Sequence, residues 1–325
     1  MIRSLFHTEE GEVRRELGRE ELKAAIEGGK GLLWVHVTGH GVSERAVLSE
    51  VFGFHHLAID DCFNGRVDTP KIDDYGEHLF IVGQSITYQN GTERLDLDEV
   101  DIFLGKNYVV SVTEERVEPV EELWGRAGQG GVFMDRGADF LAHTILDSLV
   151  DLLLPAVEDM DEALDELERE ILADPDKRHL PQLLVLKRNT LRLRRSILPQ
   201  RDLVNRLSRG EFPGLIRPEA LIFYRDVYDH IVRVEEMIEG LRDMADGALS
   251  SYLSALNNRM NEVMKTLSIV AVVFLPLTLL ASIYGTNLDY SSIGVRFEHG
   301  FYLMLGSMVL IAGALVAYFR YRRWF

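Results

Sequence analysis

Two long apolar segments near the C-terminus constrain the fold of this chain more than any other feature. Thr266–Gly285 and Gly300–Phe319 contain no charged residue. Each is about 20 residues long, which is enough for a helix to cross the ~30 Å hydrocarbon core of a bilayer. A helix buried in a soluble domain normally keeps a polar face, and neither segment has one. We therefore predict a transmembrane hairpin rather than two helices buried in a soluble core.

Positive charge flanks this hairpin, whereas its loop, residues 286–299, holds only Arg296 as a basic residue. Because basic residues favour the cytoplasmic side, we expect both termini in the cytoplasm and a multi-pass protein of the cell (inner) membrane. No charged and then apolar leader stands at the N-terminus, so we expect no cleaved signal peptide. The flanking basic residues are Arg259, Lys265, Arg320, Arg322 and Arg323.

The rest of the chain is acidic. The 325 residues carry 35 Lys and Arg against 52 Asp and Glu, and the acidic excess lies before residue 259. This charge argues against nucleic acid as a partner and favours cations, although solubility alone would also explain it. The single cysteine, Cys62, rules out an intrachain disulfide and fits a reducing compartment.

The patterns divide the chain into a cytoplasmic α/β domain, long helices and the hairpin. Asn90-Gly91 is typical of a type I′ turn between strands, and the glycines of Gly125–Gly131 indicate a loop. The predicted strands are Leu32–Val37, Leu79–Tyr88, Leu95–Leu104 and Tyr108–Thr113. The predicted segments are an α/β domain (1–135), an acidic and basic helical pair (136–217), a stalk helix (218–265), transmembrane helices (266–285 and 300–319) joined by an external loop (286–299), and a basic cytoplasmic tail (320–325).

Two helices of opposite charge follow the α/β domain. Asp139–Leu172 is predicted as one helix with an acidic end, and Pro181–Arg209 as a basic helix. We expect an antiparallel pair joined by these charges, although two solvated faces without mutual contact would give the same pattern. Exposed ion pairs contribute about 0–1 kcal/mol each, so they would select the partner helix more than stabilise the fold.

A single long helix is predicted from Pro218 to Gly285, with a kink or a free carbonyl group at Pro276. Its first part carries a heptad pattern, which indicates a seam against helices of this chain, of further copies, or of both. The seam residues are Tyr224, Ile231, Ile238, Ala245 and Tyr252, interleaved with Val227, Val234, Leu241, Ala248 and Ala255.

The membrane part of this helix carries a stripe of small, polar or flexible residues at intervals of about 3.5 residues. Bulkier residues such as Ile269 and Leu280 are expected to face lipid. Such a stripe either packs tightly on neighbouring helices or lines a water path, and two spans cannot enclose a pore without further copies. The stripe runs through Asn261, Met264, Leu267 or Ser268, Ala271, Leu275, Thr278 and Ser282 to Gly285.

The segment Asn257–Asn287, NNRMNEVMKTLSIVAVVFLPLTLLASIYGTN, closely resembles the pore segment of the CorA family of divalent-cation transporters. The family signature is Tyr-Gly-Met-Asn, and this chain has Tyr-Gly-Thr-Asn at residues 284–287. The resemblance covers the whole chain. Its other motifs are Trp34 and His36 in a strand, His55–Asp61, Thr69–Lys71 and Phe223–His230.

This resemblance implies a funnel-shaped homopentamer, in which each chain has four further copies as partners and its first span lines the pore. It implies passage of Mg²⁺, and often of Co²⁺ or Ni²⁺, down the electrochemical gradient, and no enzymatic activity. The sequence contains no phosphate-binding GxxxxGK[ST] motif, in agreement with transport that needs no ATP.

The resemblance also assigns roles along the stripe. A ring of Asn287 side chains would offer neutral oxygens to a hydrated ion, although Asn287 could instead only cap the helix. Thr278 would meet hydration water deeper in the pore, unless its hydroxyl only bonds back to the helix. The other assignments are Gly285 and Thr286 at the mouth, Leu275 and Ala271 along the pore, Met264 and Leu267 as an apolar gate, and Asn261 as a cytoplasmic polar ring. The family's external loop usually contains Met-Pro-Glu-Leu, which Leu288–Gly300 lacks, so Asp289 and Glu298 are left as the acidic attractants.

Regulation by internal Mg²⁺ is implied as well. Asp61, together with Asp60, and Asp226 match acidic positions at which the family binds Mg²⁺ between neighbouring subunits. We expect the bound ion to favour the closed pore. The alternative for Asp226 is a salt bridge to Arg225 or to the basic helix.

Three other interpretations were weighed against this one. Thr286 in place of methionine keeps open a zinc transporter on the same architecture, with or without proton coupling. A membrane-tethered coiled-coil scaffold would have no need of the polar stripe. His55 and His56 with Asp60 and Asp61 suggest a metal hydrolase only superficially, because no second cluster with convincing spacing accompanies them.

Overall fold

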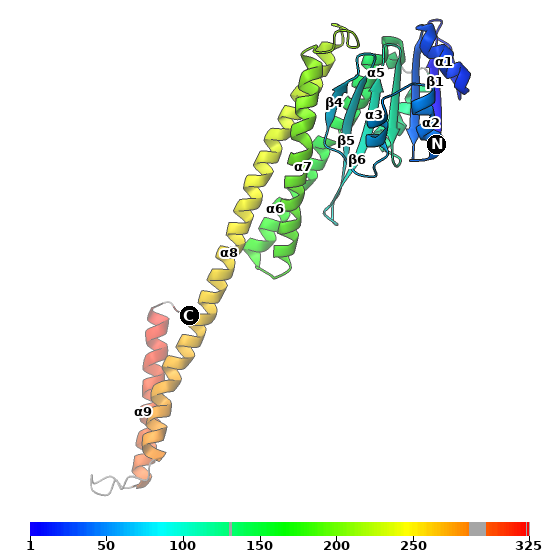
Figure 1. Ribbon diagram of the computed structural model, residues 1–325. Coiled ribbons are helices and arrows are strands. Elements are labelled where there is room, and N and C mark those ends of the chain that lie inside the picture. Colours follow the sequence, from blue (N-terminus) through cyan, green and yellow to red (C-terminus); the bar gives the residue numbers. More distant parts are fainter. Residues whose placement is uncertain (130–131, 286–296, 323, 325) are drawn as a thin grey trace. The chain divides into compact units, whose positions relative to one another are not determined.

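The structure is a computed structural model, and it describes residues 1–129, 132–285, 297–322 and 324, without the side chains of 132 and 297–300. The chain forms two compact units, Met1–Leu249 and Ser250–Phe325. The first unit contains a sheet covered by helices, and the second contains the apolar helices (Figure 1). Each unit is considered separately below.

A seven-stranded mixed sheet forms the centre of the first unit, in the order β2-β1-β3-β7-β6-β5-β4. Only β3 and β7 pair in parallel among these neighbours; the other neighbours are antiparallel. The strands are β1 (Ile2–His7), β2 (Val13–Arg15), β3 (Leu32–Thr38), β4 (Lys71–Asp74), β5 (Leu79–Gln89), β6 (Arg94–Leu104) and β7 (Tyr108–Thr113).

Both faces of the central strands are buried, which explains their nearly continuous apolar sequences. Successive residues of β3 point to opposite faces. Leu33 and Val35 join a buried cluster with residues of α1 (Arg19–Gly28), α2 (Val42–Glu50) and α3 (His56–Cys62). Trp34 instead meets Trp124 of α4 (Glu118–Ala127), with ring centroids 4.8 Å apart. Helix α5 (Ala138–Val150) packs on β5. The sheet is therefore a layer between helices.

The hairpin of β5 and β6 is confirmed, but its predicted turn type is wrong. The strands pair out to Gln89 and Arg94, so four residues connect them rather than two. Positive φ angles occur at Gly91 (87°) and Glu93 (52°), not at Asn90. The predicted loop at 125–131 is also wrong at its start, because α4 continues through Gly125 to Ala127.

The predicted helix Asp139–Leu172 is in fact two helices, α5 and α6 (Leu153–Ala173), separated at Asp151 and Leu152. Pro155 lies in the first turn of α6, where it lacks an amide hydrogen and its ring would clash with the carbonyl group of Asp151 in a continuous helix. Proline is tolerated in the first turn of a helix, so the chain restarts there.

Three long helices and a short 3₁₀ turn complete the described chain. They are η1 (Val132–Arg136), α7 (His179–Ser208), α8 (Leu221–Gly285) and α9 (Phe297–Tyr321). The predicted long helix is confirmed, although it begins at Leu221 rather than Pro218. Its heptad seam is buried from Tyr224 to Ala248 in this single chain. Up to Ala248, the seam is therefore covered by the chain's own helices.

The basic helix α7 meets a different acidic partner from the one we predicted. It lies beside α6, but its charged side chains pair with α8: Arg201 with Glu235 at 2.9 Å, Arg194 with Glu239 at 2.5 Å and Lys187 with Asp246 at 2.5 Å. Ion pairs between α6 and the start of α7 include those of Glu170 with Arg178 at 4.0 Å and with His179 at 3.3 Å. Buried residues such as Leu164 and Leu183 give α6 and α7 an apolar contact instead.

Candidate pore face and metal sites

The two apolar segments near the C-terminus are helical, as predicted, and nearly all of their side chains are exposed in the single chain. The most apolar stretches of α8 and α9 have mean hydropathies of 2.4 and 2.0, with 6% and 0% of their residues buried. The helical region Ala138–Ala173 also has an apolar stretch, but 56% of that stretch is buried. It therefore belongs to the core of the first unit, whereas α8 and α9 need another apolar environment.

The predicted stripe lies on one continuous helix. Helix α8 is helical on both sides of Pro276 and ends at Gly285. At about 100° per residue, positions seven apart lie within about 20° of one another, so Met264, Ala271 and Thr278 share a face. The stripe residues Asn261, Met264, Leu267, Ala271, Leu275, Thr278, Ser282 and Gly285 are all exposed in the single chain. This face is therefore available to water or to further copies.

One bulky residue departs from the expected pattern. Ile269 was expected to face lipid, but it is 8% exposed within the second unit. Helix α9 is the other long element of that unit, and its Phe319 is equally covered at 6%. The Phe319 ring stacks on Trp324, with centroids 5.5 Å apart. Ile269 lies about 200° around α8 from Ala271, so this covered position is on a face separate from the stripe.

The Thr278 hydroxyl bonds back to the helix, donating to the carbonyl oxygen of Phe274 at 2.8 Å. The hydrogen bond back to the helix, which was the predicted alternative to a contact with water, is therefore present. It does not exclude such a contact, because a hydroxyl oxygen that has donated its hydrogen still accepts hydrogen bonds. The waters around a cation point their hydrogens outward, and an acceptor is what they need.

Thr286, Asn287 and Asp289 lie outside the described residues, and so does the side chain of Glu298. Gly285 is the last residue of α8. The roles assigned to Thr286, Asn287, Asp289 and Glu298 stay predictions.

Asp60 and Asp61 both occupy α3, but each has a basic partner in this chain. Asp60 pairs with Arg45. Asp61 accepts a hydrogen bond from Lys71 Nζ at 2.6 Å, and the same amine lies 3.1 Å from Asp73. Although burial alone would lower it, these hydrogen bonds raise the pKa of Lys71. A metal ion at Asp61 would therefore compete with an ammonium group.

Asp226 is an exposed carboxylate on α8. In the part of the chain that the structure describes, it makes no hydrogen bond and no ion pair, so the predicted alternative of a salt bridge is not found. No contact between Asp226 and Asp61 occurs among the hydrogen bonds and ion pairs of the described residues. The shared site of Asp61 and Asp226 therefore stays a prediction.

The histidines of the hydrolase interpretation are structural. His55 caps α3, and its Nδ1 accepts a hydrogen bond from the amide of Leu57 at 3.3 Å. Its ring also lies against His56 and Tyr75. His36, part of the family resemblance, is fully buried in β3 and shares Ser111 Oγ with Trp34. Burial, assisted by Arg3, lowers the pKa of His36 to about 4, so it is neutral in the core.

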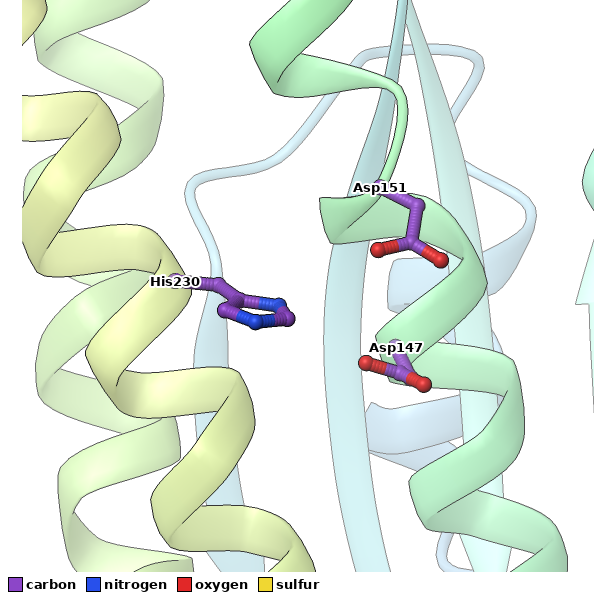
Figure 2. A group of neighbouring side chains, drawn as sticks. All are labelled: Asp147, Asp151 and His230. Atoms are coloured by element: carbon purple, nitrogen blue, oxygen red, sulfur yellow. The ribbon is translucent and has the colours of Figure 1, made fainter.

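Sequence analysis missed a convergence of three metal-ligand side chains in the first unit. Asp147 and Asp151 of α5 face His230 of α8, and their potential ligand atoms all lie within 4.8 Å of one another (Figure 2). Mainly through burial and the charge of Asp151, the pKa of Asp147 is raised to about 6. The two aspartates are four residues apart, which was visible in the sequence, but their proximity to His230 depends on the tertiary fold.

Comparison with known proteins gives a consistent result over nearly the whole chain. A family model described as CorA-like Mg²⁺ transporter protein matches residues 29–323. The cobalt/magnesium transport protein CorA of Thermotoga maritima is 34% identical over 293 residues, covering 90% of this chain and 83% of that protein. The zinc transport protein ZntB of Pectobacterium carotovorum subsp. carotovorum is 24% identical, covering 82% of this chain and 80% of that protein.

Solved structures share the fold. The complete structure of the CorA magnesium transporter from Methanocaldococcus jannaschii matches with a TM-score of 0.82 at 19% identity, covering 98% of this chain and 97% of that chain. The full-length CmaX protein matches with a TM-score of 0.76 at 24% identity, covering 99% and 97% of the two chains.

The α/β domain whose last helix continues into an uncharged, uncovered segment is matched over nearly its whole length by transport proteins, so the chain is a membrane transport protein rather than an enzyme. The family model matches far more than half of the chain. The T. maritima relative exceeds 30% identity over most of both proteins. The chain belongs to the CorA-like Mg²⁺ transporter family.

Proposed function

We propose that five copies of this chain form a funnel-shaped channel that lets hydrated divalent cations, above all Mg²⁺, pass down their electrochemical gradient. The observation that carries this proposal is the uncharged, exposed stripe along one face of continuous α8. Support for the ion comes from the T. maritima relative, which is named a cobalt/magnesium transport protein. Both termini would lie in the cytoplasm, following the distribution of basic residues.

The chemistry of Mg²⁺ explains why the stripe carries no charge. Mg²⁺ gives up its waters reluctantly, so a pore that passes it with its waters needs acceptors for water hydrogens rather than anionic ligands. The Asn287 amide and the Thr278 hydroxyl are such acceptors. Weak contacts at several levels permit an ion to enter and leave, whereas a ring of carboxylates would hold it too tightly. Exposed Met264 and Leu267 would form the apolar gate.

Ion flux into proteoliposomes tests this proposal. Asn287→Ala should abolish most Mg²⁺ uptake, whereas Leu280→Ala should leave it largely intact, because Leu280 lies about 200° around α8 from Thr278. Equal losses in the two variants would indicate a packing effect rather than a pore contact. Unchanged uptake in Asn287→Ala would contradict the proposed filter.

The external loop and the regulatory site complete the proposal. Asp289 and Glu298 would attract cations to the mouth. Asp61, with Asp60, would share a regulatory Mg²⁺ with Asp226 of a neighbouring copy, and the ion would hold the pore closed when internal Mg²⁺ is high. The exposed, unpaired state of Asp226 in the described part of the chain supports an occupant that comes from outside it.

A zinc transporter is the second candidate, since relatives named zinc transport protein ZntB match at 24% identity and Thr286 departs from the family signature. Competition between Mg²⁺ and Zn²⁺ in the same vesicles, with and without a pH gradient, separates the two. Zn²⁺ uptake that excess Mg²⁺ does not reduce and that a pH gradient accelerates would favour this candidate.

A further inference from the structure

A cavity of about 490 Å³ lies beside the first part of β6 and has no role in the proposed pore. Strand β6 pairs with β5 from Arg94 onward but with β7 only from Asp101 onward. The cavity, referred to here as the β6–β7 cavity, is lined mainly by this part of β6, by the end of β7 and residues 114–117, and by Cys62 of α3. Its volume is within the range of small-molecule sites, about 300–1,000 Å³.

Two buried polar atoms in the lining of this cavity have no hydrogen-bond partner. Asp101 and Thr113 are each 2% exposed, and neither Asp101 Oδ1 nor Thr113 Oγ1 makes a hydrogen bond within the described residues. Most buried polar atoms in folded proteins are paired, because an unpaired one is costly. An ionised carboxylate only accepts hydrogen bonds, so the occupant that satisfies Asp101 has to be a donor.

The lining also carries more negative than positive charge. Ion pairs join Arg94 to Asp96 at 2.8 Å and His40 to Glu114 at 3.7 Å. The other basic residues of the lining, which pair with none of the remaining carboxylates in the described chain, are Arg66 and Arg116. The lining carboxylates left without an ion pair are Asp98, Glu99, Asp101 and Glu115. The donor that fits this cavity is therefore a cation.

These four carboxylates form two pairs with apolar residues beside them. Glu99 and Asp101 are two residues apart on β6, so they point to the same face of the sheet. Asp98 points to the opposite face, and the charge of Glu115 is one of the causes, after burial and Asp96, that raise its pKa. An alkyl chain gains free energy by lying against apolar side chains, whereas a hydrated Mg²⁺ ion does not. The apolar residues of the lining include Leu97, Val112 and Val117.

We propose that the β6–β7 cavity binds a linear aliphatic diamine in its doubly charged form. One ammonium group donates to Glu99, Asp101 and Thr113 Oγ1, and the other lies near Asp98 and Glu115. An ammonium group has three hydrogens to donate, which matches the three acceptors of the first group. The amide of Asp68 donates to one oxygen of Glu99 and leaves the other available. Binding does not depend on the channel proposed above, so either proposal can fail without the other.

A proton competes with the diamine for the buried carboxylates. Burial, with the charge of Glu99 added, raises the pKa of Asp101. The other titratable groups that act on Glu99 or Asp101 are Asp61, Cys62 and Asp68. Binding is therefore measured at pH 8, where alkyl amines with a pKa near that of lysine are still charged.

Calorimetric titration of the full-length protein in detergent with putrescine, and with the longer cadaverine, tests the site. At least one of the two should bind saturably with one molecule per subunit, and butylamine, which has a single amine, should bind at least tenfold more weakly. Glu99→Gln and Asp101→Asn should each weaken diamine binding at least tenfold. The diamine should also raise the thermal unfolding midpoint of the unaltered protein but not that of Asp101→Asn.

Two controls separate a site from general attraction to an acidic protein. Glu166→Gln removes an exposed charge from α6, outside the cavity, and should leave diamine binding unchanged. Equimolar Mg²⁺ should not displace the diamine. The proposal would be overturned by the absence of saturable binding, by equal affinity for butylamine, by equal weakening in Glu166→Gln, or by displacement with equimolar Mg²⁺.

Discussion

At the scale of single residues, substitutions of Thr278 can distinguish a hydroxyl that contacts water from one that only stabilises the helix. Its hydroxyl donates to Phe274 in α8, which leaves the oxygen as an acceptor on the stripe. Thr278→Val keeps the shape but removes the acceptor, and loss of about 1 kcal/mol of hydrogen bonding should lower Mg²⁺ uptake about fivefold. Thr278→Ser keeps the hydroxyl and should therefore keep most of the Mg²⁺ uptake. Equal uptake by the Val and Ser variants in proteoliposomes would assign Thr278 to helix structure alone.

Glu99 on β6 gives a prediction about pH. Burial is the main cause that raises the pKa of Glu99 to about 7, and the charge of Asp68 adds to it, whereas the amide of Asp68 opposes it. Because the unfolded chain loses this proton near its ordinary pKa of about 4.5, folding becomes less favourable as the pH rises from about 4.5 to 7. Glu99→Gln removes this penalty.

Thermal unfolding at two pH values checks the effect. Glu99→Gln should be more stable than the unaltered protein by about 1–2 kcal/mol at pH 8 and by little at pH 4.5. Glu115→Gln, an exposed position, is the matched control and should show no such difference. A gain for Glu99→Gln that is the same at both pH values would contradict the assigned titration.

Single residues also mark the limit of sequence analysis. Asp60, Asp61 and Asp226 could be selected from local motifs, but their partners could not. Lys71 reaches Asp61 from β4, and His230 reaches the aspartates of α5, through contacts between residues far apart in sequence. Periodicity says which face of its own element a residue occupies, but it does not identify the element that lies opposite.

At the scale of elements, strongly patterned segments were predicted well and short or interrupted ones were not. The strand Tyr108–Thr113 agrees with its prediction, and α8 is helical as predicted up to Gly285, because long apolar runs are clear local signals. Strands β1, β2 and β4 were missed, since they depend on pairing with neighbours. Pro155 indicates the break between α5 and α6, but the apolar pattern continues on both sides of it and favoured a single helix.

The junction of α5 with α8 provides a prediction at this scale. The carboxylate of Asp139 is 2% exposed and accepts hydrogen bonds from the Arg217 amide at 3.0 Å and Nε at 2.8 Å. Tyr224 donates to the Asp139 carbonyl oxygen at 2.8 Å. Asp139→Ala should destabilise the protein by about 3 kcal/mol, since it leaves several donors without an acceptor. Tyr224→Phe should cost about 1 kcal/mol.

The thermal unfolding midpoint of the detergent-solubilised protein measures both changes. Glu219→Ala, an exposed neighbour on the same connection, should have little effect. If Asp139→Ala unfolds at the same temperature as Glu219→Ala, the junction contributes nothing measurable, and α8 is held by its apolar seam and its ion pairs with α7.

At the scale of the whole molecule, the proposed regulation depends on Asp61 of one copy and Asp226 of a neighbouring copy. Asp226→Asn should weaken inhibition by internal Mg²⁺ at least about tenfold, because removing one charged ligand costs about 1.4 kcal/mol or more of binding. Flux at low internal Mg²⁺ should be unchanged. Asp229→Asn is the matched control, since it lies on the same exposed helix but not at the proposed site.

A double variant distinguishes a shared ion from two separate effects. If Asp61 and Asp226 hold the same Mg²⁺, either substitution removes most of the inhibition, and Asp61→Asn with Asp226→Asn should add little to either one. Lys71→Met should act in the opposite direction, because it frees Asp61 from its ammonium partner and leaves the carboxylate to the metal. Dose–response curves for internal Mg²⁺ in proteoliposomes measure all four variants, namely the two single substitutions, the double variant and Lys71→Met. Additive losses in the double variant would place the carboxylates at separate sites, and the proposed bridge between subunits would then be wrong.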